Sequence, residues 1–156
     1  MLPQFVSLPF TIPNVYEGLA AAHGVAKWTN AGLVLEFQVK DSFIGMVKSG
    51  VNEVPIPFNE LVSIELKEGW FRKRLFIRVR SLTTLTNVPG HESGHIFLKI
   101  ARKDLRIARE MVSILRLTLT ERELQSHRAV IDGVNELRVG LSEQQSPPRE
   151  KGWLRE

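Results

Sequence analysis

The chain contains no cysteine among its 156 residues. This absence excludes disulfide bonds and thiolate metal ligands, and it fits a reducing compartment. No apolar run approaches the roughly 20 residues that a membrane-spanning helix requires. The first 18 residues hold three prolines and no basic segment, which a secretory signal would need. We therefore expect a cytoplasmic protein without a transmembrane segment.

Residues arranged for catalysis are also scarce. The sequence offers no nucleophile beside a base, no glycine-rich phosphate loop and no suitably spaced pair of carboxylates. One segment, His91-Glu92-Ser93-Gly94-His95, matches the HExxH pattern of zinc hydrolases, which needs both histidines on one helix face. Pro89-Gly90 and Gly94 disfavour a helix, and only His23 and His127 remain as further histidine ligands. We expect a loop here, with no enzyme, metal or cofactor; a zinc-dependent hydrolase is the remote alternative.

The net charge of +4 is modest but unevenly distributed. Residues 1–60 hold three lysines and five carboxylates, a balance of −2, so the remaining residues carry +6. Such asymmetry is compatible with an anionic partner. It is equally compatible with charged side chains that simply face water.

Most of the first hundred residues show the alternation that is typical of half-buried strands. Residues 1–14, with their prolines, predict an extended arm, and Asn14 is a possible cap for a short helix over 16–22. A hairpin with a turn at 29–32 follows, and Pro55 and Pro57 indicate an edge strand. In the next strand Val62, Ile64 and Leu66 are expected to face inward. The predicted strands cover residues 25–28, 33–40, 43–47, 51–58, 61–67, 70–82 and 96–100, with a loop over 83–94.

Residues 102–118 have the period of an amphipathic helix. Its apolar stripe consists of Leu105, Ala108, Val112, Leu115 and Leu119, widened by Ile107, Met111 and Ile114. Such a broad stripe has to be buried against another surface, and the preceding strands supply one. The order of elements predicts a mainly β, α+β fold: an antiparallel barrel of about seven strands, capped by a C-terminal helix.

A second helical segment follows the first. Thr120-Glu121-Arg122-Glu123 matches a capping box, and Leu124, Ile131, Val134 and Leu141 then share a face that His127 and Arg138 interrupt. This segment can continue the first helix, fold back on the barrel or pair with another copy. The predicted organisation is an arm over 1–17, a domain over 18–119, an extra helix over 120–141 and a flexible tail over 142–156.

The strand Leu33–Phe37 and the later run Val54-Pro55-Ile56-Pro57-Phe58-Asn59-Glu60-Leu61-Val62-Ser63-Ile64 resemble the pleckstrin-homology-like superfamily, in its GRAM-type and bacterial forms. The resemblance covers residues 18–119 and implies a barrel that binds phosphoinositides, other anionic lipids or proteins. The tryptophan that such domains often place in the C-terminal helix is missing. Phosphoinositide binding in that family usually uses basic residues around the first hairpin, where this chain has only Lys27 and Lys40.

The candidate binding site is a basic strand. Its residues are Arg72, Lys73, Arg74, Phe76, Arg78 and Arg80. Alternate strand positions share one face, so the arginines form a stripe suited to phosphate. The alternatives are a solvated face neutralised by Glu65 and Glu68, an anionic-lipid surface, a protein interface or nucleic acid; the modest charge argues against the last.

Trp70 is expected to cap a hairpin or cover the mouth of the barrel; the alternative is an exposed ring that stacks on a ligand. Together these features predict a non-enzymatic binding or self-assembly module, with a protein partner or a homo-oligomer as its interaction. The alternative is peripheral binding to anionic lipid headgroups at a membrane.

Overall fold

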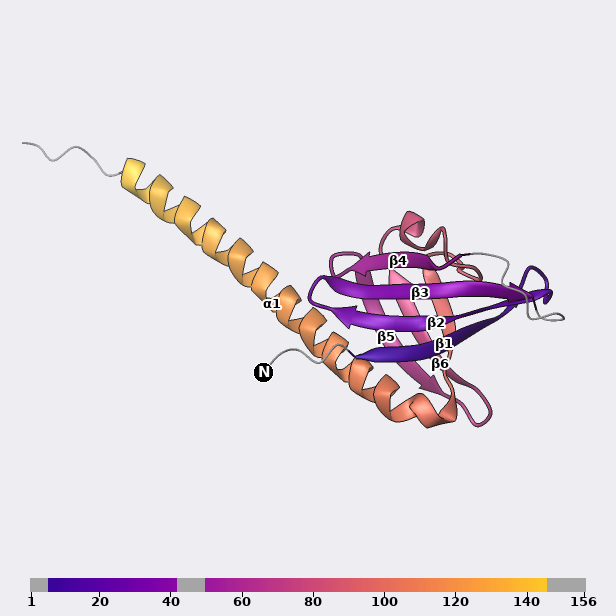
Figure 1. Cartoon of the computed structure of the whole chain (residues 1–156). Coiled ribbons are helices and arrows are strands. Elements are labelled where there is room, and N and C mark those ends of the chain that lie inside the picture. The colour runs from indigo at the N-terminus through magenta and orange to yellow at the C-terminus, as the bar shows by residue number, and fades with distance from the viewer. Residues whose placement is uncertain (1–5, 42–49, 146–156) are drawn as a thin grey trace, which may run out of the picture. The chain divides into compact units, whose positions relative to one another are not determined.

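The structure, a computed structural model, describes residues 6–41 and 50–145 and contains a sheet followed by a long helix (Figure 1). The chain forms two compact units, residues 1–119 and 120–156. Its elements are β1 (Ser7–Val15), β2 (Ala20–Thr29), β3 (Gly32–Asp41), β4 (Asn52–Pro57), β5 (Leu61–Glu68), β6 (Lys73–Val79), the 3₁₀ helix η1 (Leu82–Leu85), β7 (His95–Lys99), the 3₁₀ helix η2 (Arg102–Asp104) and α1 (Leu105–Gln144). The expected strand over 43–47 lies outside the described residues.

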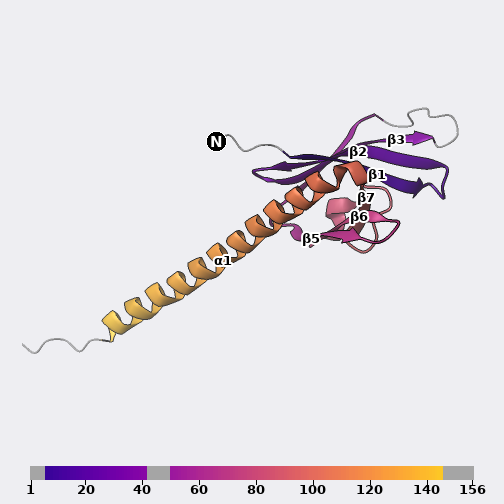
Figure 2. The same cartoon turned by 90° about the horizontal axis from the view of Figure 1, so that it is seen from below.

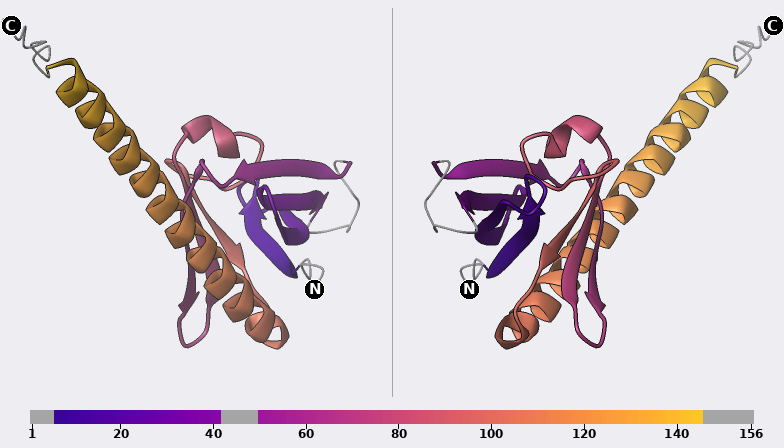
Figure 3. Two further views of the ribbon diagram at one scale, coloured as in Figure 1. Left: turned by 90° about the vertical axis from the view of Figure 1, so that its left-hand side faces the viewer. Right: turned by 90° about the vertical axis from the view of Figure 1, so that its right-hand side faces the viewer.

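All seven strands belong to one antiparallel sheet with the order β4-β3-β2-β1-β7-β6-β5. Strands β4 and β5 are its edges, so no ladder among the described residues closes the sheet into a complete barrel. Strands β1 and β7 share a single register pair, Thr11 with Lys99, and the sheet divides there into two layers (Figures 2 and 3). The mainly β, α+β architecture is confirmed, and it is consistent with a pleckstrin-homology-like fold.

The core lies between the inward faces of the sheet and the first turns of α1. Strand β6 buries Leu75, Ile77 and Val79, as their alternation predicts, and β3 buries every second residue from Leu33 to Val39. Four residues of α1 complete the core: Ala108, Met111, Val112 and Leu115. The predicted stripe is therefore buried against the sheet.

The predicted N-terminal arm is wrong for residues 7–15, which form β1 and pair with β2. Leu8, Phe10 and Ile12 are buried, while Pro9 and Pro13 occupy the exposed alternate positions. Proline lacks an N–H donor, but β1 meets β7 at only one pair, so one side of the strand has few ladder bonds to lose. The inward alternation outweighs the prolines.

The predicted short helix after Asn14 is also wrong. Asn14, Tyr16 and Glu17 have positive φ angles. Asn14 lies near the end of β1, and Tyr16 and Glu17 form a turn with Gly18 between β1 and β2. This conformation is incompatible with a right-handed helix. Ala20 and Ala22 then enter β2 as buried residues.

Strand β5 departs from strict alternation. Its pairing with β6 shifts register between Leu61 and Ser63, so Val62 is 47% exposed instead of facing inward. Ile64 regains the inward direction after the irregularity. An extra residue in one strand reverses the parity of the residues around it, and the hydrophobic pattern alone did not reveal it.

The two helices predicted on either side of Thr120 are one helix, α1, without a break. Thr120 lies in its interior, because neither proline nor glycine interrupts the chain near it and the backbone bonds continue. All residues from 120 to 145 are exposed. Residues 142–144 of the predicted tail are helical, and the tail from residue 146 onward lies outside the described residues.

An ion pair between Arg109 and Glu68 joins α1 to the sheet. Arg109 Nη2 donates to Glu68 Oε1 at 2.6 Å, and this bond lowers the pKa of Glu68 below its ordinary value of 4.5. A lowered folded-state pKa stabilises the fold at neutral pH, and this contribution is lost as the pH falls below about 4.5. We expect Glu68→Gln to cause a small loss of stability at pH 7 that is smaller at pH 3, below the ordinary pKa of the carboxyl group. Urea unfolding at both pH values measures it; an equal loss at both pH values contradicts this origin.

Candidate functional site

The outer face of β5, β6 and β7 carries three cross-strand rows. The rows are Lys67–Arg74–Lys99, Glu65–Phe76–Phe97 and Ser63–Arg78–His95. In the first row three cations are direct neighbours, and like charges placed opposite one another destabilise a sheet. The three positive charges repel one another, and a bound anion would reduce that repulsion.

Aromatic rings beside that row hold the cations in place. The rings of Phe76 and Phe97 lie 5.0 Å apart, and His95 is 5.5 Å from Phe76. Lys67 Nζ lies 4.7 Å from the Phe76 ring centre, and the Arg74 guanidinium lies 4.9 Å from that of Phe97. These cation–π contacts position the positive charges but do not neutralise them.

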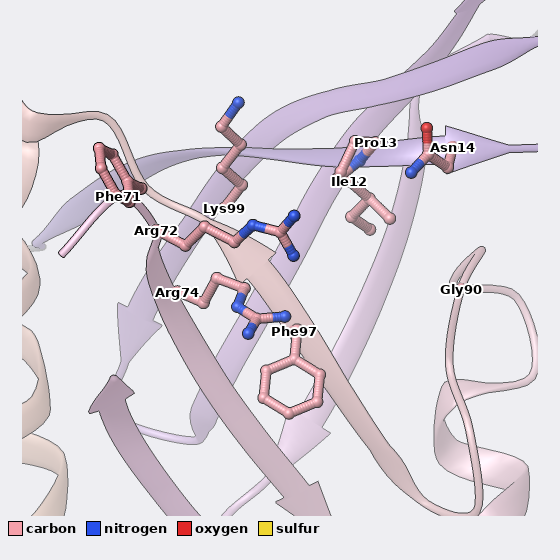
Figure 4. Close-up of a pocket in the computed structure, with 9 residues that line it drawn as sticks. All are labelled: Ile12, Pro13, Asn14, Phe71, Arg72, Arg74, Gly90, Phe97 and Lys99. Atoms are coloured by element: carbon pink, nitrogen blue, oxygen red, sulfur yellow. The ribbon is translucent and has the colours of Figure 1, made fainter. Parts of the chain in front are cut away.

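A pocket of about 520 Å³ opens at the end of this face (Figure 4). Its lining comes from the end of β1, the start of β6, the end of β7 and the loop before β7: Ile12, Pro13, Asn14, Phe71, Arg72, Arg74, Gly90, Phe97 and Lys99. In this view Arg72 lies between Lys99 and Arg74 (Figure 4). Three cations and no carboxylate are among these lining residues. We call Arg72, Arg74 and Lys99 the basic pocket.

The loop that joins β5 to β6 carries two exposed aromatic residues at its centre. Trp70 is 83% exposed and Phe71 is 86% exposed, and their rings make an edge contact at 6.3 Å. Gly69 N–H donates to the Arg72 carbonyl at 2.9 Å, and Lys73 Nζ donates to the Gly69 carbonyl at 2.6 Å. The backbone turn is therefore closed on itself while its rings face outward. We call Trp70 and Phe71 the aromatic tip.

Trp70 lies on the turn of the β5–β6 hairpin, but the expectation that it covers the barrel mouth is wrong, because its ring is exposed. The aromatic residues of the described core are Phe10, Phe37 and Phe58. A smaller hollow of about 400 Å³ borders the tip on the hairpin itself. It is lined by Lys67, Gly69, Trp70, Phe71, Arg72 and Arg74.

The structure brings together only part of the predicted basic strand. Arg72 and Arg74 meet in the basic pocket, Phe76 lies in the next row and Arg78 is exposed beside it. Lys73 binds the hairpin turn. Arg80 lies beyond the other end of β6, where its Nε donates to the Asn59 carbonyl at 3.3 Å. The expected single stripe is therefore divided between the two ends of the strand.

The predicted neutralisation by Glu65 and Glu68 is present only in part. Glu68 lies opposite Lys73 across the hairpin, and the Lys73 charge helps to lower the pKa of Glu68, but the ion pair of Glu68 is with Arg109. Within residues 6–41 and 50–145, no ion pair joins Glu65 or Glu68 to the basic residues of the candidate strand. Among these described residues, the row Lys67–Arg74–Lys99 thus has no ion-pair partner.

Sequence reasoning missed Lys67, Phe71, Phe97 and Lys99. Lys99 is distant in sequence and becomes a neighbour of Arg74 only through the β6–β7 register. For Phe71 a signal was present, because two consecutive aromatic residues beside Gly69 cannot both alternate into the core. Lys67 shares that hairpin and directly faces Arg74 across it.

The segment from His91 to His95 is a tight turn, as expected from its glycine and the preceding proline. Glu92 and His95 form an isolated β-bridge, and Ser93 and Gly94 have positive φ angles. His91 Nδ1 lies 2.7 Å from the Val88 carbonyl oxygen. The helical geometry of a zinc hydrolase is therefore not formed. The described part of the chain contains no group of three histidine or carboxylate residues placed to hold a metal ion.

No family model, curated protein or solved structure matches this chain. The resemblance to pleckstrin-homology-like domains thus stays a prediction. No helix within the described ranges combines the length and the apolar character that crossing a membrane requires.

Proposed function

We propose that the unit of residues 1–119 binds peripherally to anionic membrane surfaces through the aromatic tip and the basic pocket. The observation that carries this proposal is the exposure of Trp70 and Phe71 on a closed turn flanked by cations. Aromatic side chains favour the boundary between headgroups and acyl chains. Each lysine or arginine near an anionic leaflet adds about 1 kcal/mol of attraction.

The proposal depends on the aromatic tip and the basic pocket together, because either feature alone would also fit other kinds of partner. Exposed aromatic rings alone also suit a protein interface, and cations alone suit any polyanion. A membrane offers an apolar layer and a phosphate layer within a few ångströms of each other, which matches rings and guanidinium groups on one hairpin. The basic pocket, at about 520 Å³, is within the size range of small-ligand sites and supports recognition of a phosphate-bearing headgroup.

Nucleic acid is a poorer fit. Binding to nucleic acid normally draws on an extended basic field, whereas this chain has a net charge of only +4. The proposed function involves no catalytic step. It places the protein at a membrane surface.

Vesicle sedimentation tests the proposal. We expect the full chain to bind vesicles that contain phosphatidylserine or phosphatidic acid, to ignore phosphatidylcholine vesicles, and to dissociate as salt rises. Arg74→Glu is expected to weaken binding about 30-fold, because it replaces an attraction of about 1 kcal/mol by a similar repulsion. Equal binding to neutral and anionic vesicles would refute the proposal.

Arg78→Glu is the matched control, since Arg78 lies on the same strand but outside the basic pocket. We expect it to retain most of the binding. Circular dichroism checks that both variants remain folded. Competition by soluble glycerol phosphate distinguishes a free phosphate ester from a lipid headgroup as the ligand. Strong competition indicates a free phosphate ester. Weak competition indicates that the bilayer itself contributes through the aromatic tip.

A further inference from the structure

Helix α1 carries an exposed apolar stripe in its second half. Val130, Val134, Leu137 and Leu141 follow at spacings of four, three and four residues, which places them on one helix side. Each is between 57% and 70% exposed. We call these four residues the α1 stripe. Four such side chains in water are a liability unless another surface covers them.

The same segment is a poor helix by composition. Gly133 and Gly140 lie seven residues apart, and the segment also contains several β-branched residues, which lower helix propensity. A Cβ atom added at either glycine would meet only open space. No described residue of the chain therefore requires a glycine at these positions. A partner that approaches closely would require both.

The glycines lie beside the α1 stripe, on the border of a shallow groove of about 350 Å³. Its lining residues are Gly133, Glu136, Leu137, Gly140, Leu141 and Gln144. Alternating spacings of three and four residues are compatible with the seam by which two helices interlock. Residues 105–119, which have the same spacing and pack on the sheet, contain no glycine, so the two glycines beside the α1 stripe favour close approach of a second helix.

We infer that a second copy of the chain covers the α1 stripe, packed antiparallel to the first. With the centre of the pair between Asn135 and Glu136, Val134 lies opposite the partner's Leu137, and Leu141 lies opposite the partner's Val130. Gly133 then lies beside the partner's Gly140, so the helices can approach closely on that side. The stripe is complementary to itself in this register.

Charge and polarity select the antiparallel orientation. Glu123 lies seven residues before Val130, on the same side of the helix. A parallel pair in register would place two Glu123 carboxylates against each other, and like charges at such a position oppose pairing. The antiparallel pair separates them and places His127 opposite the partner's Gln144. Polar residues thus flank the apolar centre of the pair at both of its ends.

Sedimentation equilibrium of the full chain tests the inference. We expect a reversible dimer for the wild-type chain. Leu137→Glu places a carboxylate in the stripe and is expected to weaken the dimer at least a hundredfold. Val139→Glu is the matched control: Val139 is 58% exposed and only two residues away, but it lies on the opposite helix side, so the dimer should persist.

A second variant separates self-association from simple helix stability. Gly140→Ala raises helix propensity, so an unpartnered helix becomes more helical with no change in mass. In the antiparallel pair the added methyl group prevents the two helices from approaching closely. We therefore expect the dissociation constant of the dimer to rise at least tenfold. A wild-type chain that stays monomeric at all concentrations, or Val139→Glu disrupting as strongly as Leu137→Glu, would overturn the inference.

The absence of cysteine makes the orientation directly testable by disulfide cross-linking. Val130→Cys and Leu141→Cys are prepared as separate single variants, oxidised alone and then oxidised as a mixture. The antiparallel pair predicts cross-linking in the mixture and little with either variant alone. Efficient cross-linking of Val130→Cys to itself would indicate a parallel pair and contradict the register proposed.

Discussion

Replacing both Trp70 and Phe71 with serine is expected to lower the partition of the chain onto anionic vesicles about a hundredfold. Each ring that moves from water into the interface is taken to contribute about 1.4 kcal/mol, roughly half of its full burial, which corresponds to a factor of about ten. Because both rings are exposed, their loss should leave the urea midpoint of the unbound protein unchanged. Sedimentation with phosphatidylserine vesicles measures the partition.

The control for this pair removes two other exposed aliphatic side chains from the same unit. Val62→Ser combined with Leu82→Ser removes a smaller exposed apolar area away from the aromatic tip and should leave vesicle binding nearly intact. Tryptophan fluorescence provides an independent measurement: the emission should shift to shorter wavelength when vesicles are added to the wild-type chain, and not when they are added to the double serine variant, which retains Trp28 and Trp153. An unchanged partition in the double serine variant would mean that the cations act without the rings.

Gly24→Ala is expected to destabilise the fold by about 3 kcal/mol, near the upper end for overpacking in a core. Gly24 lies within β2, opposite Phe37 of β3 and Phe10 of β1. An alanine methyl group there would overlap the Glu36 carbonyl oxygen and lie 2.7 Å from Phe37 Cβ. The obstacle is neighbouring backbone, which cannot move without disturbing the ladder. Glycine at such a strand position marks a close backbone approach.

Urea unfolding measures this effect, with Gly50→Ala as the matched control. A Cβ atom at Gly50 would meet no other atom within 4 Å, so that substitution should change stability by less than about 0.5 kcal/mol. A Gly24→Ala protein with a midpoint equal to that of the control would show that the sheet relaxes around the methyl group. The strained packing inferred at Gly24 would then be incorrect.

Much of the fold was predictable because the relevant signals are local. The hairpin formed by β2 and β3, the inward face of β6 and the buried stripe of α1 each follow from a period of two or 3.6 residues. The N-terminal strand was missed because prolines were weighted above the alternation of Leu8, Phe10 and Ile12. The irregularity at Leu61 was missed because one extra residue leaves no mark in composition.

The candidate site was predictable only in part, for a different reason. The arginines of β6 are evident in the sequence, and their attraction to phosphate follows from their chemistry. Which of them act together depends on the register between strands. That register separates Arg80 from Arg74 and adds Lys67 and Lys99, which come from other strands.

By itself the amino-acid sequence determined the mainly β architecture, the burial of the helix stripe and the presence of basic residues on β6, because each depends on the repeat of side chains along one segment. Only the tertiary structure decided that Trp70 and Phe71 face water, that three cations from three strands form one row, and that Glu68 is occupied by Arg109. These are relations between segments. They are set by hydrogen-bond register and by the closing of a turn, which no single segment encodes.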